Sequence, residues 1–286
     1  MFDPDLIAEI HEHFDAGLTE LIGRVEARPG TELFVNKGSL DLVLTCEAAW
    51  DAPGDFEWNP ATARGTVAHK AIEFSVHWRT DPVPMELVDA AIERLSDGDR
   101  SLGLWLSTID TVNAADIRSR AVEHVTKFLE CFPALDGRWN PVLEASSQYP
   151  VNGPIVLRAR TDLVLGRPRG NESTKVIIDV KTGRLLPRHR QDLRFYALLE
   201  TLSRRVPPRL LVTYSLDAGS PEVEDVTPSL LRSTLRRTLD AIERMVEMRA
   251  EDRDPTRTPN PTCRWCPLLP TCEPGQTSLG TSNDND

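Results

Sequence analysis

Apolar residues recur every three or four positions through much of the first half of the chain, which predicts helices there. The spacing runs from the N-terminus to a turn at Pro29-Gly30. It resumes in a short helix expected from Ser39 to Trp50, with Ser39 as its N-cap. A further helix is expected from Val67 to Trp78, and residues 85–132 are expected to be helical in several pieces.

The pattern changes in the middle of the chain to short apolar runs that are typical of strands. The run from Val176 to Lys181 is almost continuously apolar, which suits a strand buried on both faces of a sheet. Strands are expected at 142–145, 155–165, 176–181 and 209–216, and helices at 189–202 and 227–250. Together these elements indicate an α/β protein.

The pattern also divides the chain into six segments. They are an N-terminal helical segment (1–60), a first core helix (61–84), a helical insertion (85–135), a core of sheet and helices (136–250), a cysteine-rich segment (251–275) and a tail (276–286). We expect the tail to be disordered, because Ser, Thr, Asn and Asp dominate it.

The 286 residues carry a formal net charge of −11, with 40% hydrophobic and 27% charged residues, which is ordinary soluble composition. The charge is unevenly spread. Between Ile155 and Arg194, ten Lys or Arg stand against four Asp or Glu, a local net charge of +6 that leaves −17 for the rest. An acidic protein with one basic segment suits an enzyme that holds a polyanion in a single groove. A solvated basic surface is the alternative.

The sequence also bears on location. No apolar run approaches the ~20 residues that span a bilayer. The N-terminal stretch alternates acidic with apolar residues and lacks the basic start and apolar core of a signal peptide. We therefore expect a cytoplasmic protein that has no membrane partner.

The stretch from Ile178 to Gly183 is the most informative for chemistry. Asp179 and Lys181 lie two apart on a predicted strand, so their side chains share a face. Antiparallel pairing with the preceding strand would bring Asp162 beside Asp179, and two converging carboxylates can hold Mg²⁺ or Mn²⁺. Such an ion polarises a phosphoryl oxygen and activates a water that Lys181 would orient. An exposed ion pair is the plainer interpretation, but a charge in so apolar a strand is costly.

The order of these residues along the chain resembles a known family. It runs through Gly65-Thr66-Val67-Ala68-His69, Asp162, Asp179-Val180-Lys181-Thr182-Gly183, and Tyr196 on the next helix. This order resembles the RecB-like exonuclease branch of the PD-(D/E)XK nuclease superfamily. The resemblance implies a restriction-endonuclease-like core, which is a mixed central sheet flanked by helices, here with a helical insertion and a C-terminal cysteine clasp.

The resemblance also implies roles for single residues. Lys181 would be the catalytic lysine, and Tyr196 would belong to the active site through the family's Gln-x-x-x-Tyr helix. The ligands of Mg²⁺ or Mn²⁺ would be His69, Asp162, Asp179 and the carbonyl oxygen of Val180.

The chain departs from the family pattern in two places. Ala159 stands three residues before the first Asp, where relatives often have Gly. Asp192 stands four residues before Tyr196, where the family has Gln, and Gln191 is one position earlier. One helical residue turns a side chain by about 100°, so the contact usually made by the glutamine is in question. Glu144 is a further candidate for the acidic cluster, or a solvated glutamate at a strand edge.

Five cysteines occur in the chain, and three of them form a C-x2-C-x5-C pattern at Cys263, Cys266 and Cys272. In a cytosolic protein, clustered cysteines indicate a metal more than disulfides. A tetrahedral zinc site or an iron–sulfur cluster needs a fourth ligand, for which the candidates are Cys46, Cys131 or a histidine.

The segment around Cys46 is similar to the Ser-x-x-x-Leu-x-x-Cys-Pro-x-x-Phe/Tyr opening of iron–sulfur members of the RecB-like branch, such as the AddB subunit and CRISPR-associated exonucleases. Glu47 stands where those relatives have Pro. The resemblance implies that Cys46 and the three C-terminal cysteines hold a structural 4Fe-4S cluster. Zinc uses the same ligands and is the alternative metal. Cys131 is interpreted as a buried free thiol.

These features predict a metal-dependent DNA nuclease, more narrowly an exonuclease, in repair, recombination or defence. Its substrate would be single-stranded or end-exposed DNA, with Arg184, Arg188 and Arg190 along the DNA path. A helicase or a repair or defence complex would be its partner, since the chain has no phosphate-binding motif of its own. The alternative is an inactive nuclease-like fold kept as a DNA-binding or assembly subunit. A zinc-stabilised interaction module would leave the order of His, Asp, Asp and Lys unexplained.

Overall fold

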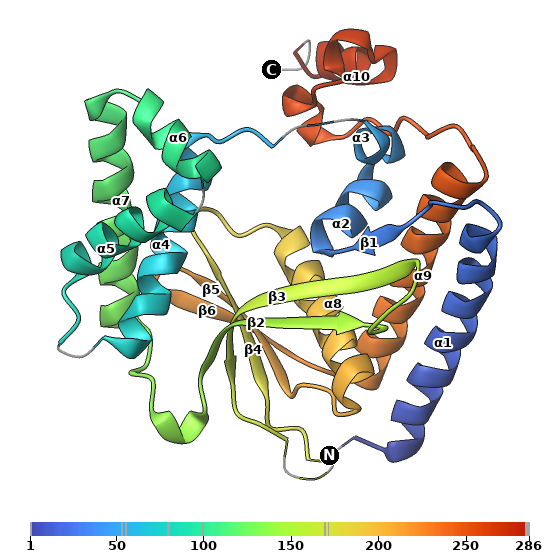
Figure 1. The fold of residues 1–286 in the computed structure, drawn as a ribbon, viewed down its shortest axis with the longest axis horizontal. Coiled ribbons are helices and arrows are strands. Elements are labelled where there is room, and N and C mark those ends of the chain that lie inside the picture. Colours follow the sequence, from blue (N-terminus) through green and yellow to red (C-terminus); the bar gives the residue numbers. More distant parts are fainter. Residues whose placement is uncertain are drawn as a thin grey trace.

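The computed structural model describes residues 2–52, 54, 56–78, 81–98, 100–168, 170 and 172–283. A six-stranded mixed sheet runs through the molecule, with helices packed around it (Figure 1). The strands are β1 (Leu33–Val35), β2 (Val142–Tyr149), β3 (Ile155–Leu165), β4 (Val176–Lys181), β5 (Leu210–Ser215) and β6 (Ser220–Asp225). The helices are α1 (Pro4–Glu26), α2 (Lys37–Thr45), α3 (Glu47–Asp51), α4 (Pro60–His77), α5 (Pro84–Gly98), α6 (Arg100–Thr108), α7 (Thr111–Cys131), α8 (Pro187–Arg204), α9 (Pro228–Ala250) and α10 (Glu273–Asn283). Short 3-10 turns lie at Gly137–Trp139, Pro261–Trp265 and Leu269–Thr271.

The long strand β3 divides one of its edges between two partners. Residues 155–157 pair in parallel with β1, and residues 163–165 pair antiparallel with β4. The other edge of β3 pairs antiparallel with β2 along most of its length. Beyond β4 the sheet continues with β5 in parallel and β6 antiparallel. Because the last β3–β4 pair is Leu163 with Ile178, the two strands diverge at Asp162 and Asp179.

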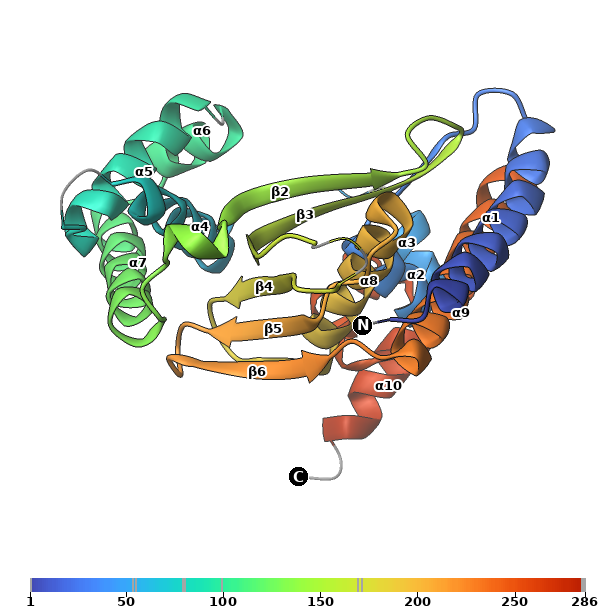
Figure 2. The same ribbon diagram turned by 90° about the horizontal axis from the view of Figure 1, so that it is seen from below.

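Two hydrophobic cores lie on either side of the sheet. The first contains α1, α8 and α9, and α1 and α9 lie side by side in both views (Figures 1 and 2). The second lies under α4, α5 and α7 at one end of the sheet (Figure 2). The expected helical pieces over residues 85–132 are α5, α6 and α7. Each fully buried Leu or Ile side chain in these cores contributes about 1.5–3 kcal/mol.

One half of the β2–β3 hairpin packs against the first core, and the other half packs against the second core. On β2, Leu143 packs in the second core and Ala145 in the first. On β3, Leu163 packs in the second core and Ala159 in the first. Side chains two apart on a regular strand share a face, so Leu143 and Ala145 can serve different cores only if the strand turns over at Glu144.

The backbone of Glu144 makes this turn. Its φ is 51°, a left-handed conformation that is uncommon outside glycine. In the register of the hairpin, Glu144 lies directly opposite Asp162, between the pairs Leu143–Leu163 and Ala145–Thr161. Two carboxylates therefore face each other at the place where the hairpin passes from one core to the other.

The short helix expected from Ser39 to Trp50 is in fact two helices. Asn36, not Ser39, is the N-cap of α2: its side chain accepts hydrogen bonds from the backbone N–H groups of Gly38 and Ser39, at 2.9 and 3.0 Å. Cys46 then adopts an extended conformation and separates α2 from α3. The prediction of Ser39 as N-cap was wrong because Asn is an equally good cap and stands three residues earlier.

The expectation of a disordered tail was also wrong for residues 276–283, which belong to α10. Gln276 explains part of this order, because its side-chain amide donates to the carbonyl oxygens of Leu269 and Pro270, each at 2.9 Å. The composition of the tail is polar, but its first turn has a folded surface to pack on. Residues 284–286 lie outside the described residues.

Cys131 is exposed rather than buried. It is the last residue of α7, where Phe128 and Phe132 stack with ring centroids 4.6 Å apart and take the inward positions. Two strands were not expected at all: β1 has three residues, and β6 has the polar sequence SPEVED at the edge of the sheet. Among the described helices, none is long and apolar enough to span a membrane.

Candidate functional site

The end of β4 places Asp179 and Lys181 on one face of the strand, as the spacing predicted. Asp179 is only 1% exposed. The ammonium group of Lys181 lies 2.6 Å from its Oδ2 and forms an ion pair with it.

Asp162 occupies the gap where β3 and β4 diverge. Its Oδ2 accepts a hydrogen bond from the backbone N–H of Val180 at 2.7 Å, and its Oδ1 lies 3.5 Å from Nδ1 of His69. Burial would raise the pKa of Asp162, but the charges of His69 and Lys181 and the hydrogen bonds to the carboxylate outweigh it and lower that pKa. Burial would lower the pKa of His69, but Asp162 outweighs it and raises that pKa.

Helix α4 brings His69 to this gap. Asn59 caps the helix by accepting from the backbone N–H groups of Ala61 and Thr62, each at 3.0 Å. The helix then passes close to the turn after β4, since a Cβ built on Gly65 would lie 3.2 Å from Oγ1 of Thr182. An alanine at position 65 would therefore require Thr182 or α4 to shift by a few tenths of an ångström.

Glu144 joins His69 and Asp162 more closely than Asp179 does. One ligand atom from each of His69, Glu144 and Asp162 lies within 4.8 Å of the other two. Across the described part of the chain, no other three His, Cys, Asp or Glu side chains meet this limit. The carboxylate of Asp179 belongs to an adjacent group, where lysines surround it. Sequence reasoning named Glu144 only as an uncertain addition, because a left-handed glutamate leaves no mark in the sequence.

Lys37, which sequence reasoning missed, lies beside Asp179. Its ammonium group is 3.4 Å from Oδ1 of Asp179 and 3.8 Å from Oδ2 of Asp192. Burial would lower the pKa of Lys37, but the charge of Asp179 and smaller contributions outweigh it and raise that pKa. Lys37 is the first residue of α2, where the helix dipole disfavours a cation. A lysine is therefore locally unfavourable at the start of this helix, and this mismatch is the signal by which Lys37 could have been found in the sequence.

The helix that carries Tyr196 reaches the same lysine. The ammonium group of Lys37 lies 5.2 Å from the centroid of the Tyr196 ring, and Tyr196 is 3% exposed. Burial raises the pKa of Tyr196, and burial also raises the pKa of Asp192 to about 6. Gln191 and Asp192 line one small cavity together with Lys37. At the family's glutamine position, this chain therefore has an Asp that pairs with a lysine from α2.

The arginines expected along the DNA path are exposed. Arg184 lies in the turn after β4, and Arg188 and Arg190 lie in the first turn of α8. The turn follows directly from Lys181 and includes Gly183, whose φ of 98° is a conformation that side-chain-bearing residues rarely adopt. These exposed cations therefore follow within ten residues of Lys181 in the chain.

A family model, that of the PD-(D/E)XK nuclease superfamily, matches residues 38–273. The chain belongs to the PD-(D/E)XK nuclease superfamily. This establishes the nuclease-type core that the sequence predicted, with its mixed sheet flanked by helices.

Solved structures support the fold alone. A proposed exonuclease from Eubacterium rectale has 10% sequence identity and a TM-score of 0.52, with 85% of this chain and 87% of that chain covered. A second structure has 17% identity and covers 73% of this chain and 95% of the other, but its TM-score of 0.33 carries no argument. No curated protein matches the sequence.

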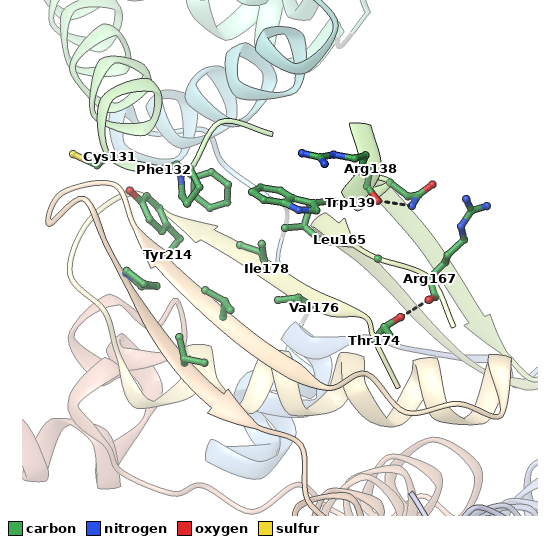
Figure 3. A pocket seen from close by; sticks show the side chains of 16 residues that line it. Cys131, Phe132, Arg138, Trp139, Leu165, Arg167, Thr174, Val176, Ile178 and Tyr214 are labelled. Atoms are coloured by element: carbon green, nitrogen blue, oxygen red, sulfur yellow. Dashed lines mark hydrogen bonds between the residues drawn. The ribbon is translucent and has the colours of Figure 1, made fainter. Parts of the chain in front are cut away.

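A cavity of about 920 Å³ lies on the other face of β4 from the acidic residues. Figure 3 shows Ile178 and Val176 pointing into it, with Phe132, Trp139 and Tyr214 around it. Asp179 alternates with Ile178 along the strand, so its side chain points to the opposite face. The cavity is therefore separate from the residues of the nuclease motif.

One small cavity is lined by the four cysteines that the sequence analysis named as ligands, Cys46, Cys263, Cys266 and Cys272. Cys46 is far from the other three in the chain. The backbone N–H of Asn260 donates to Sγ of Cys263 at 3.3 Å. No three of these sulfur atoms lie within 4.8 Å of one another in the described residues. In a tetrahedral zinc site with Zn–S bonds of ~2.3 Å, the sulfurs would be about 3.8 Å apart.

Glu47 fixes Cys46 to the C-terminal loop. Its carboxylate accepts two hydrogen bonds from Arg253, at 2.9 and 3.0 Å, and one from the backbone N–H of Thr256 at 2.9 Å. The hydrogen bonds from Arg253 lower the pKa of Glu47 to about 2. Glu47, which stands where the family has proline, therefore connects α3 directly to the loop that follows α9.

Proposed function

We propose that this protein is a Mg²⁺- or Mn²⁺-dependent deoxyribonuclease, and more narrowly an exonuclease. The observation that supports it most is the meeting of His69, Asp162 and Glu144 at the divergence of β3 and β4, next to the Asp179–Lys181 pair. Oxygen and imidazole donors of this kind suit Mg²⁺ or Mn²⁺.

His69, Asp162, Asp179 and the Val180 carbonyl are the proposed ligands, and Glu144 is added to them on its geometry. A bound ion would polarise the phosphodiester and lower the pKa of the attacking water. Lys181, held by Asp179, would orient that water and offset the charge that develops on the phosphate. The N–H of Val180 fixes the Asp162 carboxylate, so that its other oxygen faces His69.

Tyr196 and Lys37 act on Asp179 in this proposal. Lys37 holds Oδ1 of Asp179 and also approaches Asp192, while the buried Tyr196 ring supports its ammonium group. The pair of Lys37 and Asp192 would then take the place of the family's glutamine. The alternative, an inactive DNA-binding or assembly subunit, is disfavoured because Asp162, Asp179 and Lys181 are all present and in contact through the end of β4.

We also propose a structural 4Fe-4S cluster at the four cysteines. The support is the shared cavity, which brings Cys46 to the three C-terminal cysteines and so supplies the four thiols that such a cluster needs. The N–H group that donates to Cys263 suits a thiolate ligand. A protein with such thiols fits a reducing compartment such as the cytoplasm.

DNA with a free end is the proposed substrate, in repair, recombination or defence. The proposed partner is a helicase or another subunit of a repair or defence complex, which would supply the opened strand. The exposed side chains of Arg184, Arg188 and Arg190 would contact phosphates.

The test uses labelled linear and circular DNA, single- and double-stranded, with Mg²⁺ or Mn²⁺. We expect linear DNA to be degraded and circular DNA to survive. Lys181→Ala should lose this activity, whereas Lys127→Ala on α7 should keep it. Equal degradation by wild type and Lys181→Ala would show that the proposed site is wrong. A brown protein with stoichiometric iron supports the cluster, and a colourless one with stoichiometric zinc contradicts it.

A further inference from the structure

One face of the β1–β3–β2 part of the sheet carries a row of exposed side chains that leads to the proposed metal site. Along β3, Arg158 and Arg160 lie two apart and share this face, and Asp162 follows them at the divergence from β4, where the hairpin turns over. We call this surface the outer hairpin face. It consists of Phe34 from β1, Arg158 and Arg160 from β3, and Ser146 and Gln148 from β2.

The outer hairpin face lies opposite the first core. The alternate residues of the same strands, Leu33 and Val35 on β1 and Ile155 and Leu157 on β3, are buried in that core. Figure 2 shows α8 on the inner side of the hairpin, so the outer face points away from it. Phe34 is 51% exposed, which is unusual for a phenylalanine on a strand.

Phe34 and Arg158 are in contact on this face and together form what we call the platform. The guanidinium carbon of Arg158 lies 4.2 Å from the centroid of the Phe34 ring, a cation–π contact. Arg158 packs on a ring rather than against a carboxylate, so its charge is not neutralised there. An exposed aromatic ring beside a cation of this kind is what single-stranded nucleic acid binds: bases stack on the ring, and the guanidinium meets the backbone.

Arg160 connects this platform to the acidic cluster. It forms an ion pair with Glu144. Glu144 in turn lies within 4.8 Å of the ligand atoms of His69 and Asp162. One side chain therefore separates the outer hairpin face from the proposed metal, and a strand bound along the face would lead into the site.

We propose that the outer hairpin face binds the single-stranded part of the DNA substrate and guides its end to the metal site. The proposal rests on the nuclease function proposed above. Bases would stack on Phe34, and phosphates would contact Arg158. A duplex is disfavoured as the occupant, because its bases are already stacked within the helix and offer no free face to Phe34.

The experiment compares Phe34→Ala and Arg158→Ala with Trp265→Ala and Arg264→Ala. The second pair is a matched control, since Arg264 lies 5.0 Å from the ring centroid of Trp265, which is 75% exposed on the cysteine-rich loop. Binding of a fluorescent oligo-dT is measured by anisotropy in EDTA, so that no hydrolysis occurs. Hydrolysis of thymidine 5′-p-nitrophenyl phosphate with Mn²⁺ reports the metal site without any need for the platform.

Phe34→Ala should weaken oligo-dT binding about 5- to 150-fold, which corresponds to the stacking of a single base. Arg158→Ala should lower the slope of log K against log salt by about 0.7, the value for one phosphate contact on a single strand. Phe34→Trp should restore binding. The small substrate should be hydrolysed at the wild-type rate by all variants, and binding to a blunt duplex should change less than binding to oligo-dT.

Wild-type binding by Phe34→Ala would overturn the proposal. So would an equal loss in the Trp265 and Arg264 variants, an equal loss on duplex, or a loss of small-substrate hydrolysis with the platform variants. If the wild type hydrolyses neither substrate but still binds oligo-dT through Phe34, the nuclease function fails and the outer hairpin face stands.

Discussion

The acidic cluster and the cysteine cluster are built in opposite ways. The acidic cluster uses side chains from regular elements, with Asp162 and Asp179 on neighbouring strands and His69 within a capped helix. The cysteines lie where regular structure stops: Cys46 separates two helices, and the other three lie in and after 3-10 turns. The register of the sheet therefore holds the acidic side chains in place without a bound ion. The arrangement of the cysteines depends instead on contacts between loops.

This difference separates catalysis from stability. Val180 holds Asp162, and lysines hold Asp179, so the acidic side chains have partners within the protein. Around the cysteines, the connections between segments include the ion pair of Glu47 with Arg253 and the hydrogen bond from Thr256 to Glu47. We expect losses at the acidic cluster to reduce activity and losses at the cysteine cluster to reduce the free energy of unfolding.

Chelation of the divalent ion should give the largest effect. EDTA should lower the rate of DNA hydrolysis by at least about 10³-fold, since such an ion supplies several kcal/mol of transition-state stabilisation. The Tm measured by circular dichroism should change little, because the hydrogen bonds of the sheet remain. A drop in Tm as large as that of a cysteine variant would contradict the assignment of stability to the cysteine cluster and of activity to the acidic cluster.

Replacing a cysteine should give the reverse result. Cys263→Ser should lower the free energy of unfolding in urea by several kcal/mol, because metal binding at loops is coupled to folding. Activity per folded molecule should be kept. The matched control is Cys131→Ser, an exposed cysteine outside the cavity, which should change stability by less than about 0.5 kcal/mol. If both serine variants behave alike, the cysteine cavity has no structural role.

Glu47→Gln tests the connection beside Cys46 without touching a thiol. Removing one partner of a buried ion pair costs about 3–5 kcal/mol, and the Glu47 side chain is 6% exposed, so a loss near 3 kcal/mol is expected in urea unfolding. Glu251→Gln is the control, since that carboxylate pairs with Arg24 at 44% exposure and should be worth less than about 1 kcal/mol. Similar losses in the two variants would contradict the assignment.

Lys37→Gln should give the smallest effect. Without this cation, Asp179 should bind Mn²⁺ a few-fold more tightly, while kcat falls about tenfold, or about 1.4 kcal/mol in the barrier. Metal titrations of kcat separate the two quantities. Lys37→Arg should preserve part of kcat. Weaker Mn²⁺ binding in Lys37→Gln would mean that Lys37 supports the metal site rather than opposing its charge.

Much of the sheet and part of the acidic cluster were predictable from local pattern. The apolar run that forms β4 is interrupted by Asp179, and such an interruption is costly unless it is functional. The expected pairing of β3 with β4 is confirmed, and so is the fold class. The roles given to His69, Lys181 and Tyr196 stay predictions.

The rest depends on contacts between distant segments. β1 has only three residues and forms because β3 offers a free edge 122 residues later. Lys37 comes to Asp179 only when α2 packs near the end of β4. The left-handed Glu144 reflects the need of one hairpin to cover two cores. No pattern over a few residues encodes these arrangements.

The ion pair between Glu47 and Arg253 also determines when the N-terminal segment can fold during synthesis. The two residues are 206 positions apart in the chain. At ~5–20 residues per second, the ribosome needs about 10–40 s to make the intervening segment. Throughout that time Cys46 has been made but the three cysteines beside it in the finished protein have not. The N-terminal segment therefore reaches its native environment only after Arg253 has been made.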